Sequence, residues 1–434
     1  MLRRSRPFAH PALTGMLAAA LGCAPADDDT VADAPTDPGG EESRREVDAE
    51  PDADARSDAD FLAEAETDAR PDADFLAETD VPVEPGFHET TRGVVGNGRH
   101  PRLSADEGGR LHLTVDDGAR LFYRTWNGSW SAPEPVPGSD GVGANKWGRH
   151  RIWVAPDGAR VQVSWGTGWD TDVFYAWRDG GGWHGPETAC PRSVRAWEFA
   201  ATAGGSDGDA YVFCMFDDLW VAHRSPAGVW DAPTHLWTGG AKHVAAVTGP
   251  DDRIHLAFRF ARVYYANGDG SSWSPIREVT THGDSAELPA IALGPDGLVH
   301  LAWQRWLDHG GGAWAIDSVR YARGNDDTWS GGGPGVLVHE YEAPANPPEL
   351  AVDDGGRVVT AWVEGDAVLL AAAVAGGESF LGPWTVAEDP AAVHDGALEN
   401  DLATPPLAFV GTALHFVYED DAGRIAHVSG TVAP

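Results

Sequence analysis

The chain is poor in basic residues, in cysteine and in methionine. Its 434 residues include 31 Lys and Arg against 67 Asp and Glu, which gives a formal net charge of -36. Such an excess of negative charge disfavours nucleic acid and anionic membrane surfaces as main partners. Three cysteines are too few for a scaffold held by many disulfides. With 53 Gly, 31 Pro and 19 Trp, the composition favours short strands and turns over long helices.

The N-terminal apolar stretch, residues 12–22, is too short to span a bilayer. It follows a basic segment with Arg3, Arg4 and Arg6, and it ends in Ala20-Leu21-Gly22-Cys23. This ending resembles a bacterial lipobox, which implies that residues 1–23 are a lipoprotein-type signal peptide and that Cys23 is lipidated. The resemblance implies export to the outer membrane or cell surface, with the membrane reached only through the lipid. Ordinary secretion, with a periplasmic or released product, is the alternative.

Residues 24–86 are dominated by Ala, Asp, Glu and Pro. They contain 22 acidic and 4 basic residues and therefore carry about half of the net charge. A segment with so few apolar side chains cannot bury enough surface to offset the entropy of ordering it. We expect a disordered, self-repelling tether.

Two further cysteines, Cys190 and Cys214, remain if Cys23 carries lipid. An even pair in an exported protein favours a disulfide. Cys214, however, occupies a repeat position where other copies have an aromatic residue, so a buried free thiol is the alternative.

From residue 87 onward a short signature recurs, with a Gly-containing turn, an alternation of apolar residues and then an aromatic residue. One copy reads Val299-His300-Leu301-Ala302-Trp303. Copies begin 44 to 59 residues apart, at Leu111, Val161, Ala210, Ile254, Val299, Val358 and Leu414. Strand-like segments flank each copy, and several units continue after a turn with Trp. Four short strands at this period are typical of β-propeller blades.

The sequence therefore predicts an all-β fold for residues 87–434, a seven-bladed β-propeller of four-stranded blades. The seventh unit stops after its third strand, at 424–428, while residues 87–95 precede the first unit and have no other assignment. We expect this N-terminal strand to become the outermost strand of the seventh blade and to close the ring. A six-bladed ring with one irregular insertion is the alternative.

Short, similar turns on one face of such a ring contrast with variable loops on the other, and binding residues concentrate on variable loops. On that face, residues entering the first strand of four adjacent blades are expected to face the central funnel. They are Arg99, His100, Arg149, His150, Arg195, Trp197, Lys242 and His243. Arg and Lys suit carboxylate and sulfate groups, so the pattern predicts a site for an anionic ligand. The alternative is that these residues pair with acids such as Glu198 and Glu287, or stay solvated.

Aromatic residues accompany these cations on the variable face. An exposed indole can stack on a sugar ring, and the candidates are Trp147, Trp169, Trp306 and Trp314. Packing is the alternative for each of them. The repeated histidines of the second strands are expected to be structural and to form hydrogen bonds between blades. They are His112, His255, His300 and His415.

Some repeats resemble the bacterial neuraminidase repeat, or Asp-box. The segment 123–133 ends its turn in Asn127-Gly128-Ser129-Trp130, and 265–274 contains Gly270-Ser271-Ser272-Trp273. Ala266 and Gly268 stand where the family has Ser and Asp. Residues 88–434 thus resemble the sialidase-like propeller superfamily, and the surviving part of the motif serves a turn.

The same resemblance suggests weak catalytic candidates. Arg99-His100-Pro101 is similar to the sialidase Arg-Ile-Pro motif, whose Arg grips a carboxylate. Asp116 or Asp117 would be the acid, and Tyr341 would be the nucleophile. Catalytic sialidase rings have six blades rather than seven, and no motif fixes these roles.

Three functions are compatible with this sequence. The first is a monomeric, exported propeller that binds glycans, with a preference for acidic ones. The second is an enzyme on acidic polysaccharides, either a sialidase-type hydrolase or a lyase, in which a cation neutralises a uronate and Arg149, His150, Lys242 or His243 takes part. The third is a platform for protein partners. No spacing typical of a metal or cofactor site rises above chance.

Overall fold

The structure is a computed structural model. It describes residues 84–142, 150–167, 171–191, 198–215, 218–280, 285–308, 314–325, 328–374, 376–390 and 404–433. The signal peptide, Cys23 and nearly all of the predicted tether lie outside the described residues. The remainder belongs to the compact unit Glu78–Pro434. None of the described residues lies in a helix long and apolar enough to cross a membrane.

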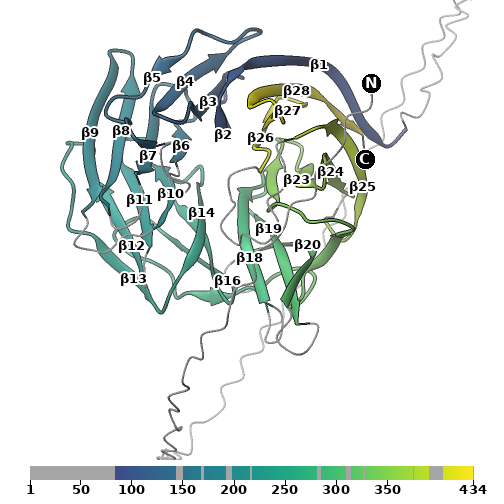
Figure 1. Cartoon of the computed structure of the whole chain (residues 1–434). Coiled ribbons are helices and arrows are strands. Elements are labelled where there is room, and N and C mark those ends of the chain that lie inside the picture. Colours follow the sequence, from purple (N-terminus) through teal and green to yellow (C-terminus); the bar gives the residue numbers. More distant parts are fainter. Residues whose placement is uncertain are drawn as a thin grey trace, which may run out of the picture. The chain divides into compact units, whose positions relative to one another are not determined.

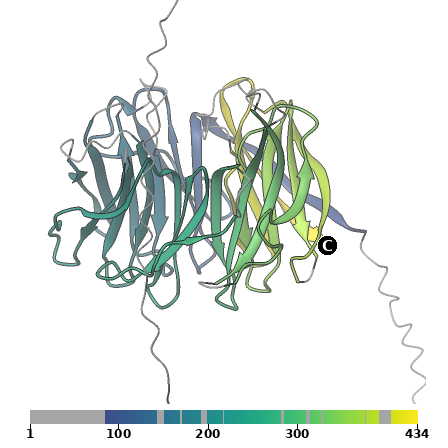
Figure 2. The ribbon, with the colours of Figure 1, turned by 90° about the horizontal axis from the view of Figure 1, so that it is seen from below.

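The described residues of this unit form a ring of antiparallel sheets (Figure 1), which Figure 2 shows from the side. The strands of the first four blades are β2 (Arg99–Ala105), β3 (Leu111–Asp116), β4 (Leu121–Trp126), β5 (Glu134–Pro135), β6 (His150–Val154), β7 (Val161–Gly166), β8 (Val173–Asp179), β9 (Gly182–Cys190), β10 (Glu198–Gly204), β11 (Ala210–Met215), β12 (Asp218–Arg224), β13 (Thr234–Thr238), β14 (Lys242–Thr248), β15 (Ile254–Phe260), β16 (Arg262–Gly268) and β17 (Arg277–Glu278).

The remaining strands complete the ring. They are β18 (Ser285–Leu293), β19 (Val299–Asp308), β20 (Trp314–Gly324), β21 (Val336–Glu340), β22 (Glu349–Val352), β23 (Val358–Glu364), β24 (Ala367–Ala373), β25 (Phe380–Glu388), β26 (Leu407–Val410), β27 (Ala413–Glu419), β28 (Arg424–Ala433) and, from the N-terminal end, β1 (Gly86–Asn97). They pair into seven four-stranded sheets, each built from strands consecutive in sequence except the last. The predicted seven-bladed β-propeller is confirmed.

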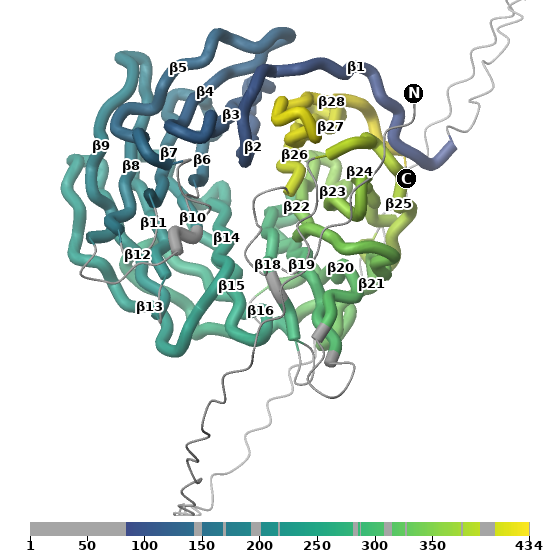
Figure 3. Tube along the Cα trace, viewed as in Figure 1, coloured from purple at the N-terminus to yellow at the C-terminus, as the bar shows by residue number. Residues whose placement is uncertain are grey.

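The N-terminal strand closes the ring as the sequence predicts. The last sheet has the order β1-β28-β27-β26, so β1 is its outermost strand (Figure 3). The pairing runs from Gly86 opposite Ala433 to Asn97 opposite Arg424. The two ends of the propeller therefore share one blade.

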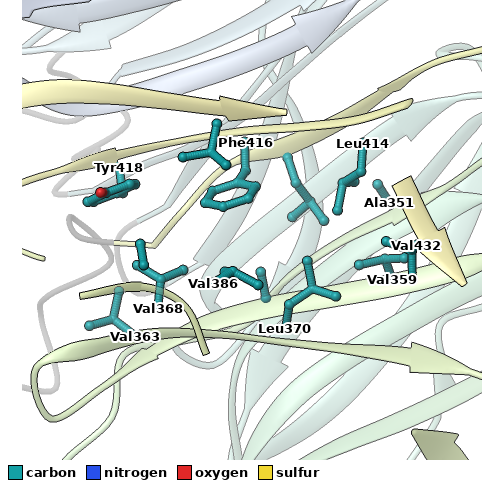
Figure 4. Packing of buried hydrophobic residues seen from close by; sticks show 14 of the residues in the cluster. Ala351, Val359, Val363, Val368, Leu370, Val386, Leu414, Phe416, Tyr418 and Val432 are labelled. Atoms are coloured by element: carbon teal, nitrogen blue, oxygen red, sulfur yellow. The ribbon is translucent and has the colours of Figure 1, made fainter. Parts of the chain in front are cut away.

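The hydrophobic core lies between neighbouring blades. Between blades 6 and 7, Leu370 and Val386 face Leu414 and Phe416, and all four are buried (Figure 4). Such close packing of strand side chains from two sheets supplies most of the apolar burial in a β fold. The seven sheets thus stabilise one another around the ring.

The repeated Trp residues connect each of blades 1 to 5 to the preceding blade in the ring. Trp183 of blade 2 packs edge-on against Tyr123 of blade 1, with ring centroids 5.5 Å apart, and Trp230 packs in the same way against Tyr175. Where the ring closes, Trp130 of blade 1 meets His427 of blade 7, and its Nε1 donates to Nδ1 of that ring at 3.3 Å. The same packing geometry recurs from blade to blade, in agreement with a structural role for the repeated Trp.

The strand histidines form hydrogen bonds within a blade, so the expectation of bonds between blades is wrong. His112 Nδ1 lies 2.7 Å from the Tyr123 hydroxyl, and His300 Nδ1 lies 2.7 Å from the Tyr321 hydroxyl. The second and third strands of a blade are direct neighbours. A His on the second strand therefore lies within hydrogen-bond distance of a Tyr on the third strand of the same blade.

Cys190 and Cys214 form a disulfide in the structure. Cys190 ends β9, the outermost strand of blade 2, and Cys214 lies in β11 of blade 3. Both are fully buried. The bond therefore joins two blades covalently.

Candidate functional site

The first strand of every blade lines a central cavity of about 890 Å³. Figure 3 shows β2, β6, β10, β14, β18, β22 and β26 around this centre. Many of the lining residues are apolar, among them Ala246, Ala292 and Ala351. The end of the cavity where the first strands begin carries Arg102, Arg151 and Glu349, and the opposite end carries Asp106 and Asp353. The cavity is thus polar at its two ends.

Local backbone geometry decides which entry residues reach this cavity. His100, His243 and Leu288 enter β2, β14 and β18 with φ values of 49°, 50° and 52°, which non-glycine residues rarely adopt. In each case the strand register shifts at that point, as in a β-bulge. A bulge turns the following side chains relative to a regular strand.

This geometry corrects the expectation that the entry residues face the central funnel. Among the described candidates, His243 lines the cavity, but Arg99, His100, His150 and Lys242 do not. We define these five residues as the mouth rim, because they surround the strand-one entries of blades 1, 2 and 4. Arg102, two residues beyond the bulge, takes the place in the wall that was expected for Arg99.

Arg102 is buried in the wall at the junction of three blades. Its Nη1 donates to the Pro101 carbonyl at 3.1 Å and to Thr404 Oγ1 at 3.4 Å. The Thr404 hydroxyl in turn donates to Glu349 Oε1 at 3.2 Å. This chain of contacts joins blades 1, 7 and 6, so Arg102 is a structural cation here.

Arg99 and Lys242 differ from Arg102 because both are exposed. Within the described part of the chain, neither has a hydrogen-bond or ion-pair partner. They lie on blades 1 and 4, which are separated by two blades in one direction and three in the other. The rim therefore presents two unpaired cations on a strongly acidic protein. Arg149, Arg195 and Trp197 lie outside the described residues.

His100 is held by a buried carboxylate. Its Nδ1 lies 2.6 Å from Asp116 Oδ2, and the Asp116 side chain is 0% exposed, against 19% for His100. The Gly118 N–H donates to the other carboxylate oxygen at 2.9 Å. Burial alone would raise the pKa of Asp116, but the hydrogen bonds from His100 and from the Gly118 N–H oppose it, and the pKa stays below its usual value. Asp116 is thus ionised and unsuited to act as a general acid.

A second carboxylate, Glu419, reaches the same place from blade 7. The His100 backbone N–H donates to its Oε2 at 3.4 Å. Burial raises the pKa of Glu419, and the Asp116 charge adds to this, against the opposing charges of His100 and Arg99. Glu419 was not among the residues predicted from the sequence. Its signal was available, since it occupies the same position relative to Leu414 as Asp116 does relative to Leu111.

His150 is a buried neutral ring rather than a cation. It is 1% exposed, and neither ring nitrogen has a hydrogen-bond partner among the described residues. Burial, together with the charge of Arg102, lowers its pKa to about 3. His150 therefore adds polarity to the rim but no charge at neutral pH.

The structure does not bring the remaining sialidase-type candidates together. Asp117 is exposed, and its carboxylate accepts the N–H groups of Ala119 and Arg120 in its own turn. The Tyr341 hydroxyl accepts a hydrogen bond from Gln304 Nε2 at 3.3 Å, and burial raises its pKa. Tyr341 packs between blades 5 and 6 and is absent from the cavity wall.

Two of the four Trp candidates fall on described strands. Trp306 and Trp314 belong to the long hairpin β19–β20, in which Asp308 lies opposite Trp314. Trp306 is half-buried, and its Nε1 has no partner within the described ranges. Trp147 and Trp169 lie outside those ranges. In the same ranges no three His, Cys, Asp or Glu side chains are placed to hold a metal ion.

Comparison with known proteins shows the fold of this chain but not its family. No family model and no curated sequence matches it. Among solved structures, the lectin BP39L of Burkholderia pseudomallei is similar, with a TM-score of 0.58 and 16% identity over 78% of this chain and 97% of that one. An ulvan lyase of polysaccharide lyase family PL25 has a TM-score of 0.57 and 14% identity over 79% and 96%. The same lyase bound to -[GlcA(1-4)Rha3S]- gives 0.58 and 13% over 79% and 96%.

Proposed function

We propose that this propeller binds glycans, with a preference for acidic ones, at the mouth rim. The observation that carries the proposal is the pair Arg99 and Lys242, two exposed cations with no partner among the described residues. The protein carries a net charge of -36, so its surface repels an anionic chain elsewhere. Charge-assisted hydrogen bonds from Arg or Lys to carboxylate or sulfate are the strongest that a surface site can offer.

The kind of ligand is supported by the similar propellers. One is a lectin and another is a polysaccharide lyase bound to a sulfated, glucuronate-containing saccharide. The rim adds the partly exposed polar ring of His100, which suits sugar hydroxyls. A protein-interaction platform, the alternative, has no comparable support from a described residue.

Glycan retention tests the proposal. The full chain is run by affinity electrophoresis through gels containing uronate-rich, sulfated, sialylated or neutral polysaccharides. We expect retention by the acidic polymers and about tenfold weaker binding for Arg99→Ala or Lys242→Ala, because each removes one charged contact. Arg110→Ala is the matched control, since Arg110 is an exposed cation in the turn at the opposite end of the first strand. Equal losses in all three variants, or equal retention by neutral polymers, would contradict the proposal.

We further propose that the protein is exported as a lipoprotein anchored through Cys23, with residues 24–86 as the tether. The basic segment, the short apolar stretch and the Ala20–Cys23 ending support this. Cys23→Ser is expected to move the protein from the detergent phase to the aqueous phase in a partition assay of bacterial cells that express it. Detergent partitioning that survives the substitution would exclude lipid on Cys23.

A further inference from the structure

Among the described residues, the junction of blades 7 and 1 brings a cation and a left-handed histidine together with two carboxylates. Arg99 and His100 enter β2, Asp116 ends β3, and Glu419 ends β27. The left-handed backbone at His100, with φ 49°, directs its N–H toward Glu419 while its ring contacts Asp116. Strained non-glycine residues persist where the surroundings over-determine them, and they cluster at functional sites.

Asp116 fixes the orientation and the tautomer of His100. An ionised carboxylate only accepts hydrogen bonds, so the 2.6 Å contact places the proton on Nδ1. In the neutral ring, Nε2 then carries the lone pair. No described residue contacts Nε2 by a hydrogen bond, and the partly exposed ring makes this nitrogen accessible. This is the arrangement of an oriented general base.

Glu419 and Arg99 complete the set. Glu419 is half-buried. Among the described residues, its carboxylate receives only the long 3.4 Å contact from the His100 N–H, and its setting favours the protonated form. Arg99 lies opposite Asp116 in the strand register and is exposed. A base, an acid and a free guanidinium are thus contributed by two adjacent blades.

Blade 4 provides an internal comparison. Lys242 and His243 repeat the cation and the left-handed histidine, with φ 50°. The residue opposite Lys242 in the register is Arg259, where blade 1 has Asp116 opposite Arg99. Blade 4 therefore provides positive charge without a carboxylate at this position, which suits binding alone.

We propose that the blade 7–blade 1 junction cleaves 4-linked uronate polysaccharides by β-elimination, with His100 as the base and Glu419 as the acid. The inference rests on the proposed binding of acidic glycans at the rim. Arg99 binds the uronate carboxylate and neutralises the charge that develops there. Asp116 is a positioning residue, because it acts through His100.

The step balances without any added oxidant or co-reactant. The C5–H bond breaks, and the proton moves to His100 Nε2. The electron pair of that bond forms the C4–C5 double bond, and the C4–O bond to the leaving sugar breaks with its pair on oxygen. The Glu419 carboxyl group donates a proton to this oxygen. One product carries a conjugated unsaturated uronate, and the other carries a new hydroxyl group.

The experiment measures product and retention on the same samples of the full chain. Polymers of 4-linked glucuronate, galacturonate or mannuronate residues are incubated with the protein, and the conjugated double bond is followed by ultraviolet absorbance and mass spectrometry. We expect product from at least one polymer. His100→Asn is expected to lower turnover by about 100-fold or more, and Glu419→Gln by at least about 10-fold, with retention kept. Asn is chosen because it tolerates the left-handed backbone.

Asp116→Asn and Arg110→Ala serve as further readouts. Asp116→Asn is expected to lower kcat more than it raises KM, because the base loses its orientation while the binding cation remains. Arg110→Ala is expected to leave both unchanged. Thermal unfolding of each variant shows whether it is folded, and the nearly isosteric Glu419→Gln keeps the test decisive if another variant fails to fold.

Three outcomes would overturn the inference. Retention of uronate polymers without any unsaturated product would remove the lyase activity and leave the proposed binding function intact. Product whose rate is unchanged in both His100→Asn and Glu419→Gln would place the chemistry elsewhere. Absence of both retention and product would overturn the binding function together with the inference.

Discussion

Asp116 and Glu419 are two carboxylates at one repeat position in adjacent blades, and their chemical settings are opposite. Each is the fifth residue after the start of the signature in its unit, and each stands at the end of the second strand. The pKa of Asp116 is held down, whereas the pKa of Glu419 is raised. Pairs of titratable groups whose surroundings push their pKa values apart are typical of acid–base sites.

The difference comes from the hydrogen bonds that each carboxylate receives. Both carboxylates are shielded from water, which raises the pKa of a carboxyl group. Asp116 receives a short hydrogen bond from His100 and another from the Gly118 N–H, and Glu419 receives only a long one from the His100 backbone. Both contacts involve His100. The two carboxylates thus share one repeat position, while the groups around them shift their pKa values in opposite directions.

The largest effect is expected on removing the charge of Asp116. Asp116→Asn keeps the shape of the side chain but removes the charged partner of His100. We expect a loss of about 3 kcal/mol in the free energy of unfolding at neutral pH. Urea unfolding measures it. In the wild type, a carboxyl with a depressed pKa stabilises the fold above its unfolded pKa of about 3.9, and this stability is lost as the pH falls through the folded pKa. The free energy of unfolding should therefore fall less on acidification in Asp116→Asn than in the wild type.

Asp117→Asn provides the control for this prediction. Asp117 carries the same side chain one residue later but is exposed, and Asn can accept the same turn hydrogen bonds. Its effect should stay within about 0.5 kcal/mol. Equal destabilisation by the two substitutions would show that burial of Asp116 beside His100 has no energetic consequence.

A smaller effect is expected on removing the imidazole. His100→Asn keeps a residue that tolerates the left-handed backbone but removes the contact to Asp116, and we expect a loss of about 2 kcal/mol, typical of a hydrogen bond to a charged group. A double-mutant cycle with Asp116→Asn isolates the pair. The two losses should be clearly less than additive. Simple additivity would mean that the two side chains do not interact.

Much of the fold could be predicted from the sequence, because each blade is a local unit. Seven copies of the signature gave the number of blades, and the missing strand after residues 424–428 could be matched to residues 87–95. The bulges could not be predicted, because a left-handed His or Leu has no local sequence signal. They explain why Arg102, and not Arg99, stands in the cavity wall.

The residues of the proposed site were selected only in part from the sequence, for a related reason. Arg99, His100 and Asp116 were selected from short segments of one blade. Glu419 was missed because it is 319 residues from His100 in sequence, and only ring closure brings the two together. His150 was grouped with the cations because burial, which lowers its pKa to about 3, cannot be seen in one strand-entry motif.

The smallest effect is expected for Glu419→Gln, and its sign on the free energy of unfolding is opposite to that of Asp116→Asn. Glu419 has a raised pKa, so the folded state holds its proton more tightly than the unfolded state does, and stability falls as the pH rises from the unfolded pKa of about 4.3 through the folded pKa. Glu419→Gln removes this penalty. We expect the variant to be about 0.5 kcal/mol more stable than the wild type at neutral pH, with the advantage gone below about pH 4. Urea unfolding of both proteins across this pH range measures the difference.

A loss of stability in Glu419→Gln at neutral pH would mean that the Glu419 carboxylate is stabilised there, as Asp116 is. The two positions would then be alike, and Glu419 would not be protonated when a substrate arrives. Because the stability profile requires no substrate, it tests the proton state of Glu419 independently of any catalytic assay. Opposite signs for Asp116→Asn and Glu419→Gln are therefore the sharpest evidence that one blade junction has separated two equivalent carboxylates into a fixed charge and a proton donor.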